Sequence, residues 1–342
     1  MLVEARGLGK EFPASGSRFG RQEVVHAVQD VDLQIAPGET LGVIGESGCG
    51  KSTLGRLLLR LVEPTRGQVL FDGQDLSTLS GRALRSLRRE MQIVFQDPFA
   101  SLDPRMRVGE IVGEGMEVHG IASGDGLRRR VASLLEEVGL RAEHAQRYAH
   151  EFSGGQRQRI GIARALAVSP RFLVLDEPVS ALDVSVQAQV VNLLADLQRA
   201  RGLSYFFVAH DLRVVAHLSH RIAILYLGRI VEIGERERVL AQPAHPYTRA
   251  LLDAVPEPGA ARPPVLGGDL PSPLRPPGGC GFHPRCGWMQ PRCCEERPRL
   301  RDVAAGQRAA CDVLPFAGEI AAGGQSGKDV GGTETPEEEK PR

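Results

Sequence analysis

The sequence has no net charge and no long apolar run. Its 42 Lys and Arg balance its 42 Asp and Glu, so no overall basic field favours nucleic acid or an anionic membrane surface. No stretch approaches the ~20 apolar residues that cross a bilayer. The first residues, MLVEARGLGKEF, also lack the cationic start and apolar core of a secretory signal. If the protein serves a membrane, we expect another chain to do the crossing.

Cysteine is scarce and unevenly placed. Only six Cys are present: Cys49 stands alone, and the other five follow residue 279. Such a distribution argues against a secreted disulfide framework and favours a reducing compartment. The late cluster therefore needs its own explanation.

Short apolar runs alternate with helical patterns. The runs TLGVIG (40–45), FLVLDE (172–177) and SYFFVAH (204–210) are typical of buried strands in a largely parallel sheet. Helical periodicity covers 51–61, 126–140 and 184–202. The alternation predicts an α/β fold.

The chain divides into regions of different composition. We predict a first unit over 1–240, with a helical insertion at about 97–164, where no strand run is found. Residues 241–316 begin with a Pro- and Gly-rich connector and are expected to form a second compact, loop-rich unit. The Gly-rich and then acidic residues 317–342 are expected to be disordered.

A phosphate-binding motif follows the first apolar run. Residues 45–52, GESGCGKS, fit G-x-x-x-x-G-K-[ST] between a strand and an amphipathic helix, in a chain with only four Lys. The glycines let backbone amides surround phosphates, Lys51 reaches the β and γ phosphates, and Ser52 offers a hydroxyl to Mg²⁺. The expected phosphate-binding residues are Gly45, Glu46, Ser47, Gly48, Cys49, Gly50, Lys51, Ser52 and Thr53.

Two carboxylates close the run FLVLDE. Asp176 is the candidate on the metal side of the phosphate site. Glu177 follows at the end of the strand, where it can orient and deprotonate an attacking water. The alternative is that an Asp-Glu pair simply begins a polar loop.

Further motifs resemble those of a known protein family. Residues 152–158, FSGGQRQ, closely resemble the signature motif of ATP-binding-cassette proteins, and Gln96, the segment 180–183 and His210 follow that family's order. The resemblance covers roughly residues 1–240. It implies a P-loop ATPase core with a helical subdomain and a head-to-tail dimer that encloses two ATP molecules. The residues expected to act in trans at the dimer interface are Ser153, Gly154, Gly155, Gln156 and Asp183, of which Asp183 would link the two sites.

The same resemblance suggests roles for three further side chains. Gln96 would contact Mg²⁺ or the attacking water and mark the hinge to the helical insertion. His210 would hydrogen-bond the γ phosphate and act with Glu177 in catalysis. Phe12 is our choice for the aromatic ring that stacks on adenine, with Phe19 as its competitor.

Residues beyond the cassette narrow the family. HPYTRALL (245–252), PSPL (271–274) and GGCGFHPRC (278–286) resemble the C-terminal extension of the ATPases of oligopeptide, dipeptide and nickel importers. That implies import of a small solute, most readily a peptide, by a peripheral subunit at the cytoplasmic face of the cell membrane. The implied partners are two permease chains, a second ATPase subunit (a paralogue or another copy) and an extracytoplasmic solute-binding protein. The alternative is a non-transport cassette ATPase acting on DNA or ribosomes, although no nucleic-acid partner is expected.

The late cysteines predict a bound metal. Cys280, Cys286, Cys293 and Cys311 offer four soft ligands in a region with little apolar core of its own. Their spacing lacks the paired C-x2-C elements of common zinc sites and suits a 4Fe–4S cluster better than zinc. Cys294 is a substitute for Cys293, and unliganded buried thiols are the alternative.

Overall fold

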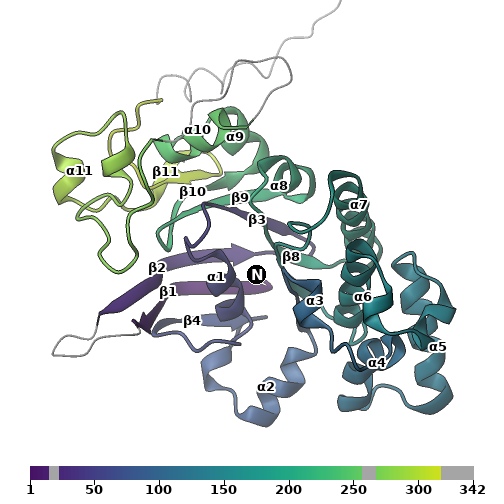
Figure 1. Ribbon diagram of the computed structural model, residues 1–342. Helices are drawn as coiled ribbons and strands as arrows, with labels where there is room; N and C mark the ends of the chain where they lie inside the picture. Colours follow the sequence, from purple (N-terminus) through teal and green to yellow (C-terminus); the bar gives the residue numbers. More distant parts are fainter. Residues whose placement is uncertain (15–22, 256–266, 317–342) are drawn as a thin grey trace, which may run out of the picture.

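The computed structural model describes residues 1–14, 23–255 and 267–316, which form two sheets surrounded by helices (Figure 1). The larger sheet has the strand order β11-β12-β10-β9-β3-β8-β7-β6. Its strands are β3 (Thr40–Ile44), β6 (Met91–Val94), β7 (Phe172–Asp176), β8 (Ser204–Val208), β9 (Arg221–Tyr226), β10 (Arg229–Glu235), β11 (Arg301–Ala304) and β12 (Gln307–Ala309). The pairs from β6 through β9 are parallel, and β10 turns back antiparallel on β9.

The parallel strands are largely apolar because both faces of this sheet are covered. In β7, Leu173 and Leu175 belong to one core, while Phe172 and Val174 face a second core on the opposite side. Alternate side chains of a strand point to opposite faces, so a strand covered on both sides carries a continuous apolar run. The predicted α/β fold is confirmed.

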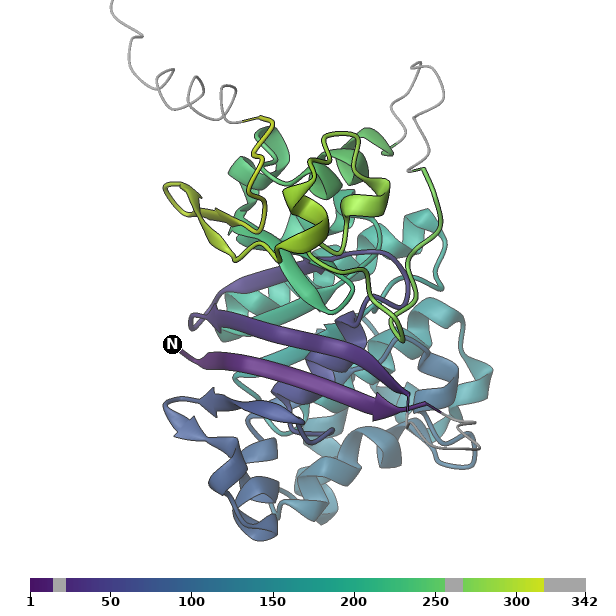
Figure 2. The same ribbon diagram turned by 90° about the vertical axis from the view of Figure 1, so that its left-hand side faces the viewer.

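A second, antiparallel sheet lies against the second core and has the order β2-β1-β4-β5. Its strands are β1 (Val3–Pro13), β2 (Val24–Ile35), β4 (Arg66–Phe71) and β5 (Gln74–Asp75). Figure 2 shows β1 and β2 as two long strands beneath the C-terminal residues. The sequence analysis assigned no strand to these residues, because the polar exposed face of these strands breaks up the apolar runs.

Helices fill the connections between the strands. They are α1 (Lys51–Leu58), α2 (Gly81–Arg88), α3 (Pro98–Ser101), α4 (Val108–Val118), α5 (Gly124–Glu137), α6 (Gly154–Leu166), α7 (Val184–Arg201), α8 (Leu212–Leu218), α9 (Arg236–Ala241), α10 (Pro246–Asp253) and α11 (Arg292–Glu295). Short 3₁₀ turns lie at Leu76–Thr78, Ala142–Gln146, Ala149–Glu151 and His283–Arg285. Residues 97–164 contain only helices and turns, apart from one isolated bridge between Arg107 and Tyr148. No helix in the described ranges is long and apolar enough to span a bilayer.

The C-terminal extension is continuous with the main sheet. Strand β12 pairs antiparallel with β10, from Glu232↔Ala309 to Gly234↔Gln307, and β11 pairs with β12. The second compact, loop-rich unit expected from the sequence thus extends the main sheet at an existing strand edge. The predicted disordered tail, 317–342, lies outside the described residues.

Candidate functional site

The loop between β3 and α1 has the shape that a phosphate cradle requires. Gly50 adopts φ 105°, a left-handed conformation, and helix α1 begins directly after it at Lys51. A Cβ at Gly50 would lie 2.1 Å from the carbonyl oxygen of Ala27. Only glycine satisfies both constraints, and it points the amides of a helix N-terminus into the loop.

A cation and a hydroxyl occupy the base of this loop. Lys51 is 5% exposed, and its Nζ donates to the carbonyl oxygens of Gly45 at 2.7 Å and Glu46 at 3.0 Å. The hydroxyl of Ser52 donates to Oδ1 of Asp176 at 2.7 Å. Burial raises the pKa of Asp176, and the Ser52 hydrogen bond opposes that rise. The hydroxyl of Ser52 on α1 and the carboxylate of Asp176 at the end of β7 are oxygen ligands that suit a hard divalent cation.

Glu177 lies where β7 ends, at the carboxyl edge of the sheet. Its backbone takes φ 45°, unusual for a residue with a side chain, and its N–H donates to Val208 of β8. Its Oε2 accepts a 3.0 Å hydrogen bond from Nε2 of Gln96 and lies 3.8 Å from Nδ1 of His210. Two polar side chains from two other segments, Gln96 and His210, therefore converge on the Glu177 carboxylate.

Lys51, Ser52 and Glu177, together with Gln96 and His210, line one open cleft of about 550 Å³. This volume is within the usual size of a small-molecule site. Its lining residues are Phe12, Val25, Ala27, Ser47, Gly48, Gly50, Lys51, Ser52, Thr53, Gln96, Glu177, His210 and Pro273. Val25, Ala27 and Pro273 were missed by the sequence analysis. Pro273 belongs to the PSPL segment, which had been singled out only by resemblance, and its carbonyl accepts from the N–H of His26 on β2.

Of the residues predicted to bind phosphate or Mg²⁺ within this chain, four do not line the cleft: Gly45, Glu46, Cys49 and Asp176. Cys49 is 1% exposed and packs into the second core, so any contact it makes with phosphate comes from its backbone. Burial raises the pKa of its thiol. Phe12 lines the cleft, while its competitor Phe19 lies outside the described residues.

The signature-motif residues lie apart from this cleft. Ser153 caps α6: its hydroxyl accepts from the N–H of Gln156 at 3.4 Å, and its own N–H donates to Oε1 of Gln156 at 3.0 Å. The carboxylate of Asp183 caps α7 by accepting from the N–H of Val186 at 3.0 Å, and this hydrogen bond lowers the pKa of the carboxyl. Two helix N-termini with exposed capping side chains are thus presented outward. That of α6, which is capped by a neutral hydroxyl, can meet an anion on another molecule.

The predicted metal cysteines gather around one small cavity. Cys280, Cys286, Cys293 and Cys311 all line it, whereas Cys294 is exposed and does not. Across the described ranges, however, no three His, Cys, Asp or Glu side chains form a group that could hold a metal ion. The four cysteines therefore do not form a preformed site for the predicted metal.

Two family models match this chain. The model for ABC transporters matches residues 28–180, and the model for the oligopeptide/dipeptide transporter C-terminal region matches residues 231–293. The first contains the phosphate loop, Glu177 and the signature motif. The second contains the HPYTRALL and PSPL segments and the first three cysteines of the cavity.

Similar proteins agree with both matches. A peptide import ATP-binding protein of Brucella ovis is 51% identical over 91% of this chain and 97% of its own length. The oligopeptide transport ATP-binding protein YkfD of Bacillus subtilis is 50% identical, covering 91% and 95%. The dimeric ATP-binding cassette MJ0796 bound to ADP and Pi has a TM-score of 0.61 and 30% identity, covering 68% and 98%. The chain belongs to the ABC transporter family, among the ATP-binding subunits that carry the oligopeptide/dipeptide transporter C-terminal region.

Proposed function

We propose that this chain binds and hydrolyses ATP and thereby powers import of a small solute, di- or oligopeptides first, through a membrane permease. The observation that carries the proposal is the single cleft in which the phosphate loop, Glu177, Gln96 and His210 meet. The peptide import names of the relatives support the choice of cargo.

In the proposed reaction, water attacks the γ phosphorus and ADP leaves as the bond to the bridging β–γ oxygen breaks. Glu177 accepts the proton that the water loses. Gln96, which already donates a hydrogen bond to Glu177, and His210 hold that water in line with the bond that breaks. Lys51 and the loop amides stabilise the charge that develops on the phosphates.

We propose that Mg²⁺ is held by Ser52, Asp176 and Gln96, of which Ser52 and Asp176 are already joined by a hydrogen bond. The ion would neutralise phosphate charge. Phe12 is proposed to stack on adenine, and Pro273 also lines the cleft.

The second half of each site is proposed to come from another ATPase subunit, a paralogue or a second copy. Ser153, Gly154, Gly155 and Gln156 at the N-terminus of α6 would bind the γ phosphate across the interface, and Asp183 would link the two sites. The outward position of these residues supports this arrangement, as does the dimeric form of MJ0796.

The remaining partners follow from the importer family. We propose two permease chains, an extracytoplasmic solute-binding protein and a peripheral position at the cytoplasmic face of the cell membrane. The exposed Phe99 of α3, three residues after Gln96, is the proposed permease contact. A role on DNA or ribosomes is not favoured, because the relatives described above are importer subunits. For domain limits we propose 1–240, with the helical part at about 97–164, and 241–316.

For the cysteine cavity we propose a 4Fe–4S cluster rather than zinc. The proposal rests on four thiols around one cavity and on the preference of such clusters for four thiolates, not on a preformed metal site. Iron, acid-labile sulfide and zinc should be measured in anaerobically purified protein. A sample that contains none of them would refute the proposal.

The proposed function is tested by Glu177→Gln, with Glu143→Gln at an exposed position as the matched control. The wild type and the control should hydrolyse ATP, whereas Glu177→Gln should lose turnover by about 10²-fold or more, in line with loss of a general base. The same variant should accumulate as an ATP-bound dimer in gel filtration. Normal turnover in Glu177→Gln would show that this carboxylate is not the base.

A further inference from the structure

Glu46, the second residue of the phosphate loop, is held from outside the cassette motifs. Its carboxylate accepts two hydrogen bonds from the guanidinium of Arg285, at 2.6 and 2.9 Å, and its N–H donates to the hydroxyl of Tyr247 at 3.0 Å. Both partners lie in the C-terminal region, 239 and 201 residues further along the chain. The loop is therefore fixed by a segment that the cassette motifs do not include.

Arg285 is itself held rigidly. Its side chain is only 4% exposed, its Nε donates to the carbonyl of Gly267, and one terminal nitrogen lies 3.5 Å from the hydroxyl of Tyr226. A fork with two parallel hydrogen bonds fixes direction as well as distance, which a single exposed ion pair does not.

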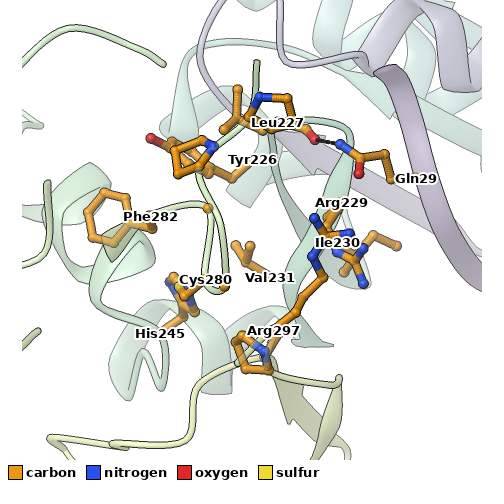
Figure 3. A pocket seen from close by; sticks show the side chains of 16 residues that line it. Gln29, Tyr226, Leu227, Arg229, Ile230, Val231, His245, Cys280, Phe282 and Arg297 are labelled. Carbon is orange, nitrogen blue, oxygen red and sulfur yellow. Dashed lines mark hydrogen bonds between the residues drawn. The ribbon is translucent and has the colours of Figure 1, made fainter. Parts of the chain in front are cut away.

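An aromatic cluster anchors the segment that carries Arg285. The ring of Phe282 packs edge-on against Tyr226, with centroids 5.4 Å apart, and lies 5.4 Å from the ring of Tyr247. Figure 3 shows Phe282 and Cys280 of the extension beside Tyr226 and His245, around a pocket bounded on its far side by Gln29 of β2. Phe282 is 3% exposed, so the arginine segment is packed into the body of the molecule.

We propose that Arg285 is a positioning residue for ATP: it acts through Glu46 to hold the phosphate loop in the conformation that binds the phosphates. The inference deepens the proposed function and rests on it. The carbonyl oxygen of Glu46 also accepts a hydrogen bond from the ammonium group of Lys51. A displacement of Glu46 would therefore move one of the acceptors that hold Lys51. Loss of this preorganisation lowers affinity because binding must then order the loop.

The pair should be tested with Arg285→Met, Glu46→Ala and the double variant in the full-length chain. Arg301→Met is the matched control, since this extension arginine contacts the backbone of Cys311 and not the loop. Mg-ATP affinity would be measured by calorimetry, and folding by thermal unfolding without nucleotide. Each single variant should bind ATP about tenfold more weakly, equivalent to about 1.4 kcal/mol. The double variant should be no more than about twofold worse than either single variant, because both substitutions break one contact.

The outcomes separate this inference from the proposed function. A wild type that does not bind ATP would overturn the proposed function itself. A wild type that binds ATP while folded Arg285→Met binds it equally well would overturn only the inference, as would losses that multiply to about a hundredfold in the double variant. If Arg285→Met does not fold, the ATP affinity of Glu46→Ala is the deciding measurement, because Glu46 is partly exposed. Unchanged ATP affinity in Glu46→Ala would refute the positioning role.

Discussion

Acidification should destabilise this protein through one buried histidine. His245 caps the N-terminus of α10, where its Nδ1 accepts a 3.0 Å hydrogen bond from the N–H of Tyr247. The residue is 1% exposed, and burial lowers the pKa of His245 from 6.5 to about 3. Protonation would also remove the acceptor that caps the helix, so the folded state resists it.

The sign and size follow from this depressed pKa. Between pH 6.5 and pH 3 the unfolded chain binds a proton at His245 that the folded chain does not, so its contribution to stability falls as the pH falls. At pH 5 the difference amounts to about 2 kcal/mol relative to pH 7.5. Carboxylates also make the free energy of unfolding depend on pH, so the contribution of His245 must be isolated with a variant.

The assay is urea unfolding, followed by circular dichroism, of wild type and His245→Asn at pH 7.5 and pH 5. Asn caps helices well and does not titrate in this range, so the variant should be less sensitive to acid. The difference in free energy of unfolding between the two proteins should therefore change by about 2 kcal/mol between these pH values. His217→Asn, at an exposed position, serves as the control. An identical difference at both pH values would refute the reasoning.

Two further substitutions probe the packing around the site. The buried carboxylate of Glu232 accepts hydrogen bonds from the N–H groups of Ala244 and His245 and from the side-chain amide of Gln307. Glu232→Ala leaves these buried donors without an acceptor, so the free energy of unfolding should fall by about 3 kcal/mol or more. Thermal unfolding checks this, and a midpoint within 1 °C of wild type would contradict it. Gly155→Ala places a Cβ 2.3 Å from Cγ1 of Val186, so α6 and α7 must separate at a cost of about 1–3 kcal/mol. Adding Val186→Ala should recover most of that loss; no recovery would show that the clash is not the cause.

Local chemistry explains why much of the site could be predicted from the sequence. The phosphate loop, the Asp-Glu pair and the signature motif each depend on a few adjacent residues whose backbone geometry is set locally. Gly50, for example, must be glycine because of its own φ of 105° and the nearby carbonyl of Ala27. The continuous apolar runs likewise identified β3, β7 and β8, because strands covered on both faces have no polar side.

Long-range packing decided what the sequence did not show. The sequence alone determined the α/β core, the phosphate loop and the order of the motifs. Only the tertiary structure joined β12 to β10, placed Pro273 beside the nucleotide cleft and paired Arg285 with Glu46 across 239 positions. Such contacts have no local signature, because an arginine before a cysteine looks the same whether it faces solvent or a carboxylate. Their partners are chosen by how the extension packs on the sheet, and that is a property of the whole fold.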